Sequence, residues 1–264
     1  MPKEKRFLVD VGMNDLPFPM RVVSERDPKG QATIASISIS ARIMHEFEAR
    51  WIDKFIEILH RHRDRIGPET LRHNIVDYLV ELKASTVKVN FRYPFFIEKI
   101  TPVSKEKCLV KYDCSYSAKV SSIDNKPKII FEMSIPVITT YPASFLEKKE
   151  GLFGQLSIIH IELETLKDIY PEPIANMVDK HALVPVYSYL SQEDQKYLIH
   201  KIHSEAKSSV VTVDEIKNEL TYNTDIDSYS VKCSNYGMLH SYNTIIGVEK
   251  SVWVPFSEYE AEEI

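Results

Sequence analysis

The residues best suited to chemistry in this chain are histidines in its second half. His200 and His203 are one turn apart in the predicted helix "SQEDQKYLIHKIHSEAK", so their imidazoles face one side and can share a ligand. Two histidine nitrogens from one helix, completed by a third residue, form a common site for zinc or iron. His181 and His240 lie in the same half and are further candidates. These residues raise the hypothesis of a divalent metal site.

A solvated basic face explains the same helix without a metal. Basic residues form one stripe of the helix and apolar residues form the opposite stripe. The basic stripe comprises Lys196, His200, His203 and Lys207, and the apolar stripe comprises Leu198, Ile202 and Ala206. An amphipathic surface helix has this pattern whether or not it binds anything. A third interpretation is that the basic stripe contacts an anionic ligand.

Other polar positions also allow both a structural and a functional interpretation. His240 follows the turn-like "SNYG" and is either a structural histidine or part of a site. His160 alternates with Glu162 and Glu164, which favours an exposed strand face. Asp113 lies on the polar side of its strand, where it would orient a base or face water.

Lysines gather around the segment "ITPVS". Lys99, Lys105 and Lys107 surround it and would meet the phosphates of a ligand, or only keep the surface soluble. Several familiar catalytic signatures are absent from the sequence. It has no glycine-rich phosphate loop, nucleophile elbow, zincin helix or Cys-x-x-Cys pair.

The composition is that of a globular protein with a substantial core. The chain has 264 residues, of which 44% are hydrophobic and 27% charged. A net charge of −5 gives no electrostatic reason to expect nucleic acid or an anionic membrane as a partner. No apolar run approaches the roughly 20 residues of a membrane span. The start "MPKEKRFLVD" lacks the apolar segment and cleavage site of a secretory signal.

Three cysteines are too few for a disulfide framework. Cys108, Cys114 and Cys233 show no paired spacing, which favours reduced thiols and a cytoplasmic protein. The first two are six residues apart on one predicted strand. We therefore expect them to pack in the core and not to bind a metal.

Strands and helices alternate in the same order in both halves. Apolar–polar alternation predicts strands in the segments "ATIASISIS", "TVKVNFRYPFF", "CLVKYDCSYSAKV" and "KIIFEMSIPVI". A further, weaker strand is expected around Met20–Val23, and the turn "DNKP" at 124–127 makes the last two segments a hairpin. Between the first two lie the predicted helices "HEFEARWIDKFIEILHRH", with Phe47 on its apolar stripe, and "GPETLRHNIVDYLVELK".

The second half continues with the strand "QLSIIHIELETL" and two helices. Ser191 with Asp194 and Thr212 with Glu215 resemble capping boxes at the starts of those helices. The segments "DSYSVKC" and "HSYNTIIGVEK" predict two closing strands, and the acidic "SEYEAEEI" ends the chain.

This order predicts an α+β fold of two tandem ββααββ units. The units cover residues 1–123 and 128–252, and an acidic tail covers 253–264. Alternating strands indicate an antiparallel sheet with helices on one face. Because such a sheet leaves open edges, we expect a homo-oligomer, a dimer or tetramer, that closes it into a barrel.

A family resemblance adds to this interpretation. The segments "DVGMNDLPFPM", "YPFFIEKITPVS", "KYDCSYS", "IPV", "EDQKYL" and "NYGMLH" occur in the order seen in type IB GTP cyclohydrolases. The resemblance covers roughly residues 9–250. It implies the tunnelling fold, built from two tandem units of the kind predicted above.

The resemblance also implies a reaction. In that family, metal-activated water opens the imidazole ring of GTP, formate leaves, and the ring recloses to dihydroneopterin triphosphate. The site lies between subunits, where a glutamate binds the guanine edge and basic residues hold the triphosphate. The implied ligands are a purine nucleotide or pterin and a zinc or iron ion.

The chain departs from the family pattern at most of the implied metal ligands. The family's Cys-Pro-Cys-Ser loop corresponds to Tyr141, Pro142, Ala143 and Ser144. Its Gln-Arg-Ser-His segment corresponds to 155–158, where Gln155 is kept and Ile158 replaces the histidine, and its Gly-Thr-His stretch to 48–50. The glutamate after its Asp-Glu-Lys-Tyr segment corresponds to His200. Its Glu-Ser-Ile-His-Asn-His segment corresponds to 237–242, where His240 is kept.

From these correspondences we expect a diverged family member with an altered or lost metal site. His200 and His240 are the expected catalytic residues and the expected metal ligands, if a metal binds at all. Because a catalytic site needs about three protein ligands, His203, His181 or Asp113 would have to supply another. We expect the substrate to contact Tyr141, Ser144, Gln155, Lys99 and Lys196. The alternative is a non-catalytic pseudoenzyme or regulatory subunit that assembles with an active relative.

Overall fold

The first half of the chain forms four strands of the sheet and two helices that pack on it. The structure is a computed structural model that describes residues 8–44, 51–142, 152–165, 167–237 and 239–250. Phe47, the 48–50 stretch, Ala143, Ser144 and the tail at 253–264 lie outside the described residues. The elements are β1 (Leu8–Val22), β2 (Gln31–Met44), α1 (Trp51–His62), α2 (Pro68–Glu81), β3 (Thr86–Ile100) and β4 (Lys107–Ser121). The strand predicted around Met20–Val23 is the end of the much longer β1.

The second half contains one helix more than the sequence predicted. Its elements are β5 (Lys128–Thr140), β6 (Gly154–Thr165), α3 (Pro171–His181), β7 (Val184–Pro185), α4 (Gln192–Ser204), α5 (Ser209–Tyr222), β8 (Ile226–Tyr236) and β9 (Thr244–Lys250). Helix α3 and the short β7 were not predicted. Asn125, with a φ of 50°, lies in the predicted turn between β4 and β5.

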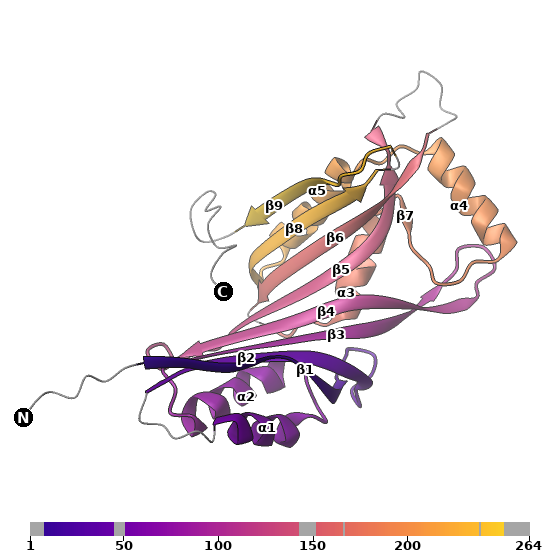
Figure 1. Cartoon of the computed structure of the whole chain (residues 1–264). Coiled ribbons are helices and arrows are strands. Elements are labelled where there is room, and N and C mark those ends of the chain that lie inside the picture. Colours follow the sequence, from indigo (N-terminus) through magenta and orange to yellow (C-terminus); the bar gives the residue numbers. More distant parts are fainter. Residues whose placement is uncertain (1–7, 45–50, 143–151, 166, 238, 251–264) are drawn as a thin grey trace, which may run out of the picture.

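All the strands form a single antiparallel sheet. Its order is β1-β2-β3-β4-β5-β6-β8-β9, and β7 pairs with the end of β5. Figure 1 shows this sheet running across the whole molecule, with α1 and α2 over the first half and α3 and α5 over the second. In the described part of the chain the sheet stays open, with β1 and β9 at its edges.

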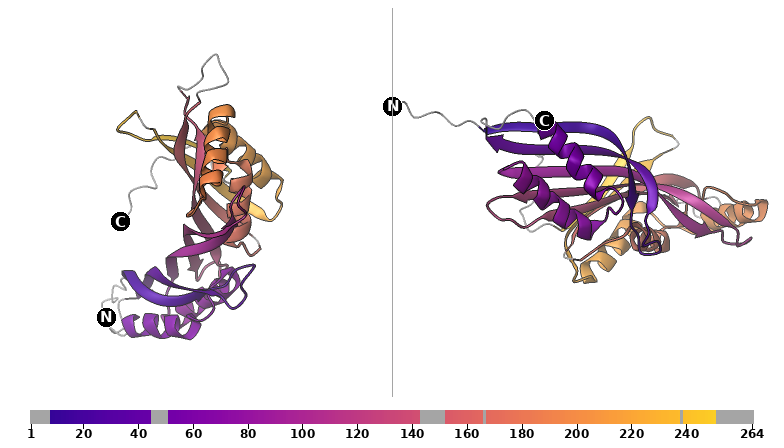
Figure 2. Two further views of the ribbon diagram at one scale, coloured as in Figure 1. Left: turned by 90° about the vertical axis from the view of Figure 1, so that its right-hand side faces the viewer. Right: turned by 90° about the horizontal axis from the view of Figure 1, so that it is seen from below.

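One face of the sheet is covered by helices and the other is open. Along β3, Val87, Val89 and Phe91 are buried while Lys88 and Arg92 are exposed. The other long strands alternate in the same way, and the buried side chains of β1 to β6 and β8 meet those of α1, α2, α3 and α5 in one core. Val184 of β7 packs with Leu183 and with Leu198 of α4 in a second, smaller cluster. Figure 2 shows the sheet as a curved layer with the helices on one side. The predicted α+β class and the single helical layer are confirmed.

Two predicted details of the helix starts have different outcomes. The capping box at α4 is confirmed, because Asp194 N donates to Ser191 Oγ and Ser191 N donates to Asp194 Oδ2. The box predicted at Thr212 was wrong. Helix α5 begins earlier, where Ser208 accepts a hydrogen bond from Val211 N, and Thr212 is buried inside the helix.

The cysteines lie in the core, as expected. All three are buried and unpaired. Burial raises the pKa of the Cys233 thiol to about 11 and also raises that of Cys114. Neither thiol is therefore ionised near neutral pH.

Candidate functional site

A buried carboxylate fixes the helix that carries the candidate histidines. Asp194 is 0% exposed at the start of α4. Its Oδ1 accepts hydrogen bonds from Val103 N at 2.8 Å and Ser104 N at 3.0 Å, and its Oδ2 accepts one from Ser104 Oγ at 2.6 Å. These bonds hold the pKa of the carboxyl well below its usual range. The loop between β3 and β4 therefore anchors α4.

The same loop is internally braced. Thr101 is fully buried, its hydroxyl hydrogen-bonds to Ser104 Oγ at 2.7 Å, and it accepts from Glu106 N at 3.0 Å. Figure 1 shows the β3–β4 hairpin reaching towards α4. The segments "ITPVS" and "EDQKYL", which carried the family resemblance, thus form one structural unit.

Lys99 lies in an interior ion pair. Its Nζ is 2.6 Å from Asp179 Oδ2, and the two side chains are 9% and 16% exposed. The ammonium also donates to Val186 O at 3.3 Å and lies over the rings of Tyr112 and Tyr187. Burial raises the pKa of Asp179. This position favours a link between β3 and α3 over a phosphate contact.

The two helical histidines point to different environments. His203 Nδ1 donates to Leu152 O at 2.6 Å, and its ring packs edge-on against Phe153. His200 is exposed on α4, as is Lys196. His203 therefore joins α4 to the start of β6, while His200 and Lys196 belong to the solvated stripe.

Helix α4 approaches the end of the β5–β6 hairpin closely. A Cβ built at Gly154 would lie 2.8 Å from Ile138 Cγ2 and 2.9 Å from Ile202 Cγ2. Such distances leave no room for a side chain, so only glycine fits between α4 and β5. This contact brings the helix next to the loop that carries Tyr141.

Tyr141 and His240 meet at Gly237. A Cβ built at Gly237 would lie 3.4 Å from Tyr141 Cε2 and 4.0 Å from His240 Cδ2. Tyr141 is 8% exposed, and Tyr141 N donates to Phe153 O at 2.7 Å. His240 is exposed and stacks on Tyr242, with ring centroids 4.9 Å apart. Two predicted site residues, one just after β5 and one in the β8–β9 connection, therefore both lie close to Gly237.

Gln155 is buried beneath this region. It is 4% exposed, and its Nε2 donates to Thr139 Oγ1 at 3.2 Å and to Thr140 O at 3.5 Å. Thr140 is also paired with the α4–α5 connection, because Lys207 N donates to Thr140 Oγ1 at 2.7 Å. The end of β5 is therefore fixed from two sides.

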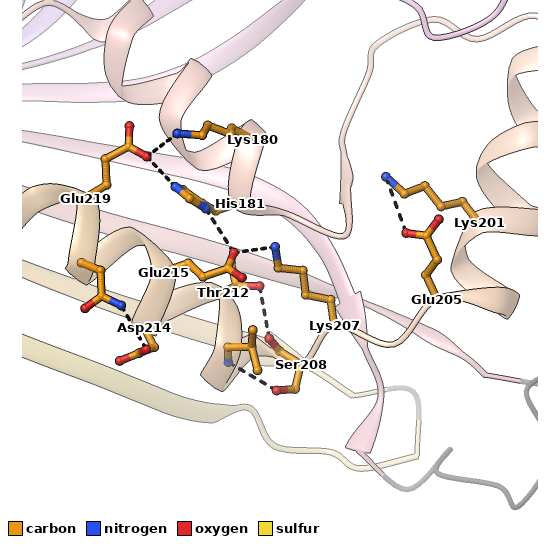
Figure 3. A network of polar contacts seen from close by, with 12 residues as sticks. Lys180, His181, Lys201, Glu205, Lys207, Ser208, Thr212, Asp214, Glu215 and Glu219 are labelled. Atoms are coloured by element: carbon orange, nitrogen blue, oxygen red, sulfur yellow. Dashed lines mark hydrogen bonds and ion pairs between the residues drawn. The ribbon is translucent and has the colours of Figure 1, made fainter.

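His181 lies in a network of charged side chains between α3 and α5. Its Nδ1 is 3.1 Å from Glu215 Oε2 and its Nε2 is 2.6 Å from Glu219 Oε2. Lys207 and Lys180 also pair with these two carboxylates and hold both pKa values below their usual range. Figure 3 shows the network extending from α3 to Lys207. His181 has a structural explanation here.

The open face of the sheet carries the remaining polar candidates. A hollow of about 420 Å³ is lined by residues of β2 to β5, among them Arg92, Asp113 and Glu132. His160 is exposed there, as predicted, and contacts Ser134 Oγ through Nδ1 at 2.9 Å. Partial desolvation on the sheet surface, followed by the charge of Lys232, lowers the pKa of His160. Burial, and to a smaller extent the negative charge of Glu132, raises the pKa of Glu162.

A family model covers nearly all of this fold. The model described as "Type I GTP cyclohydrolase folE2" matches residues 2–245. The chain belongs to the type I GTP cyclohydrolase FolE2 family. Among its FolE2 relatives, the GTP cyclohydrolase FolE2 of Geobacter sp. (strain M21) is 27% identical over 241 residues, which are 91% of this chain and 89% of the relative. That of Syntrophus aciditrophicus (strain SB) is 29% identical over 91% of this chain and 93% of the relative.

The fold of this FolE2 family chain is also found in uricases. The crystal structure of uricase from Arthrobacter globiformis matches with a TM-score of 0.55 at 6% identity, covering 96% of this chain and 97% of that one. A uricase from Bacillus fastidious matches with a TM-score of 0.52 at 9% identity, covering 92% of each chain. At these identities the likeness concerns the fold, which is of the tunnelling type.

The described side chains of this FolE2 family chain do not form the metal site that the resemblance implies. A catalytic zinc or iron needs about three protein ligands. Within the described residues, no three His, Cys, Asp or Glu side chains are grouped so that they would hold an ion. A complete site around His200 or His240 would need donors from elsewhere. Across the same residues, no helix combines the length and apolar character of a membrane span.

Sequence reasoning missed the buried polar residues next to the candidate site of this FolE2 family chain. Thr139, Ser157 and Asn235 are at most 3% exposed. Thr139 is hydrogen-bonded to Ser157, and Ser157 to Asn235, across neighbouring strands. The available signal was a polar residue at an inward-facing strand position, since Ser157 alternates with the buried Ile159.

Proposed function

We propose that this chain binds GTP or a related purine nucleotide or pterin where Tyr141, Gly237 and His240 meet. The proposal is supported by the family match over residues 2–245, together with the approach of two predicted site residues from separate connections to Gly237. Within the family we assign it to the type IB group, on the sequence segments quoted above.

The residues at this place have suitable chemistry for such a ligand. The Tyr141 side chain is 8% exposed, so only the edge of its ring would contact a planar base or pterin. His240 is exposed, and its imidazole can donate or accept a proton at the ligand. Lys196 is an exposed cation on α4 that would attract phosphates. The contacts predicted for Gln155 and Ser144 remain predictions, since Gln155 is buried and bonded to Thr139 and Thr140.

We further propose that the metal-dependent step is altered or lost. A bound zinc or iron would supply an activated water, and His200 and His240 are the side chains of this chain that would approach it. Because the described donors fall short of three, we assign no step to a metal. Binding without turnover is therefore an expected outcome for this chain.

An assembly of several copies would complete the proposed site. The edge strands β1 and β9 have unpaired outer edges among the described residues, and Ile245 on β9 is 70% exposed. Exposed edges of this kind are commonly covered by another chain. We propose a homodimer or homotetramer, which light scattering after size exclusion would measure.

The experiment combines binding and turnover. Purified protein without a histidine tag is titrated calorimetrically with GTP, guanosine and dihydroneopterin, and formate release from GTP is followed with and without Zn²⁺, Fe²⁺ or Mn²⁺. The proposal expects saturable binding of at least one compound and a tenfold weaker affinity in His240→Ala. The matched control is His160→Ala, on the open face. Absence of binding across the panel would refute the proposal.

A further inference from the structure

Asn235 lies at the centre of a buried hydrogen-bond arrangement near the end of β8. Its Oδ1 accepts from Ser157 Oγ at 2.8 Å and from Cys233 Sγ at 3.3 Å. Its Nδ2 donates to Ser209 Oγ at 3.1 Å and to Thr244 Oγ1 at 3.3 Å. A carboxamide has two donor hydrogens and an oxygen that accepts two bonds, so this group is saturated. One side chain thereby joins β6, β8, β9 and the start of α5.

The arrangement continues across the sheet as a chain with one direction. Because Ser157 donates its only hydroxyl hydrogen to Asn235, the 2.8 Å contact between Thr139 Oγ1 and Ser157 Oγ requires Thr139 to donate. Thr139 Oγ1 in turn accepts from Gln155 Nε2. The sequence of donors therefore runs from Gln155 through Thr139 and Ser157 to Asn235.

Two members of this hydrogen-bond chain, Thr139 and Asn235, lie just before the residues that meet at Gly237. Thr139 is two residues before Tyr141. Asn235 is two residues before Gly237, and its partner Thr244 is the first residue of β9. The connection that carries His240 therefore lies between Asn235 and Thr244, which are hydrogen-bonded to each other through the Asn235 carboxamide.

We propose that Asn235 is a positioning residue whose hydrogen-bond chain holds Tyr141 and His240 on either side of Gly237 without help from a metal ion. The segments it ties are those where the family resemblance places metal ligands. Here the described donors do not fit a metal, while hydrogen bonds join β5, β6 and β8 directly. A metal that binds at His240 would enter a preformed pocket and would not be part of its framework.

The framework is tested without any ligand. Thr139→Val removes the hydroxyl at nearly constant volume, Thr139→Ser keeps it, and Asn235→Ala removes the central group. We expect Thr139→Val and Asn235→Ala to lower the melting temperature by about 3–10 °C. We also expect both variants to speed amide exchange at 139–141 and 244–246, which are hydrogen-bonded or paired in the sheet. Thr139→Ser and the control Ser234→Ala, on the open face of β8, should retain slow exchange there. EDTA or 1,10-phenanthroline should leave the wild-type melting temperature unchanged.

The effect of the Asn235 hydrogen-bond chain on ligand binding rests on the proposed function and is tested separately. If wild-type protein binds GTP or a pterin, Asn235→Ala and Thr139→Val should weaken binding about tenfold, and Thr139→Ser should restore it. If wild-type protein binds none of them, the proposed function fails while the exchange data still decide the framework. The proposal is overturned if a chelator destabilises the protein and zinc restores it, if exchange at 139–141 and 244–246 is unchanged, or if affinity is unchanged in the variants.

Discussion

Asp194 on α4 and Ser104 in the β3–β4 loop are joined by two hydrogen bonds although they are 90 residues apart in sequence. Ser104 N donates to Asp194 Oδ1 at 3.0 Å, and Ser104 Oγ donates to Asp194 Oδ2 at 2.6 Å. Since α4 carries His200, His203 and Lys196, this pair sets where those side chains lie. The first prediction concerns how much this pair contributes to the stability of the protein.

Asp194→Asn should lower the melting temperature by several degrees at pH 7. In the variant, one carboxylate oxygen is replaced by an NH₂ group. The N–H and O–H donors of Ser104 and Ser191 that face it then lose their acceptor. Because the folded pKa of Asp194 is depressed, its contribution is complete above the unfolded pKa of about 4 and is lost as pH falls through the folded pKa. The gap between wild type and variant should therefore narrow below about pH 4. Glu193→Gln, at an exposed neighbouring position, is the control.

Replacing Lys99 distinguishes an ion pair from a phosphate contact. Lys99→Met leaves Asp179 buried without a partner, which should cost about 3–5 kcal/mol in the free energy of unfolding. The double variant Lys99→Met/Asp179→Leu should recover most of that loss. Chemical denaturation measures both. A stable Lys99→Met variant with weakened nucleotide binding would instead support the phosphate role predicted from the sequence.

Gly154→Ala should destabilise the contact between α4 and β5. The added methyl group would overlap Ile138 and Ile202, and overpacking of this kind costs about 1–3 kcal/mol. Gly247→Ala is a suitable comparison because its Cβ would meet the flexible side chain of Lys232. Equal unfolding free energies for the two variants would show that α4 does not press on β5 as described.

The thiols should be unreactive in the folded protein. All three cysteines are buried, and burial raises the pKa of Cys114 and Cys233 above the ordinary thiol value. Ellman's reagent at pH 8 should therefore label them only at the rate of unfolding, and all three should react in guanidinium chloride. Rapid labelling of a native thiol would contradict their burial.

Much of the fold follows from local patterns, and the missed parts are those that depend on distant residues. Ile37 and Val89 were predicted to face the core because strand side chains alternate, and both are buried. Helix α3 was missed because Pro171 and Pro173 in "YPEPI" favour a loop when their neighbours are unknown. In the structure, Pro171 occupies the first turn, where proline is tolerated.

The candidate site was predictable only in part. The sequence segments pointed to Tyr141 and His240, which the structure brings together at Gly237. They could not show that Lys99 would meet Asp179, 80 residues away, or that Asn235 would join Ser157 to Thr244. Such pairs depend on which strands and helices become neighbours, and helical or strand periodicity carries no information about that.

The central claim is that Tyr141 forms part of a pocket for a purine nucleotide or pterin, and equilibrium binding to Tyr141 variants tests it most directly. Wild-type protein should bind GTP, or another member of the purine and pterin panel, with a saturable isotherm. Tyr141→Ala should weaken that affinity at least tenfold, a loss of about 1.4 kcal/mol, while Tyr141→Phe and the exposed control Tyr197→Ala should leave it unchanged. No saturable binding to wild type, or equal affinities for all four proteins, would contradict the account.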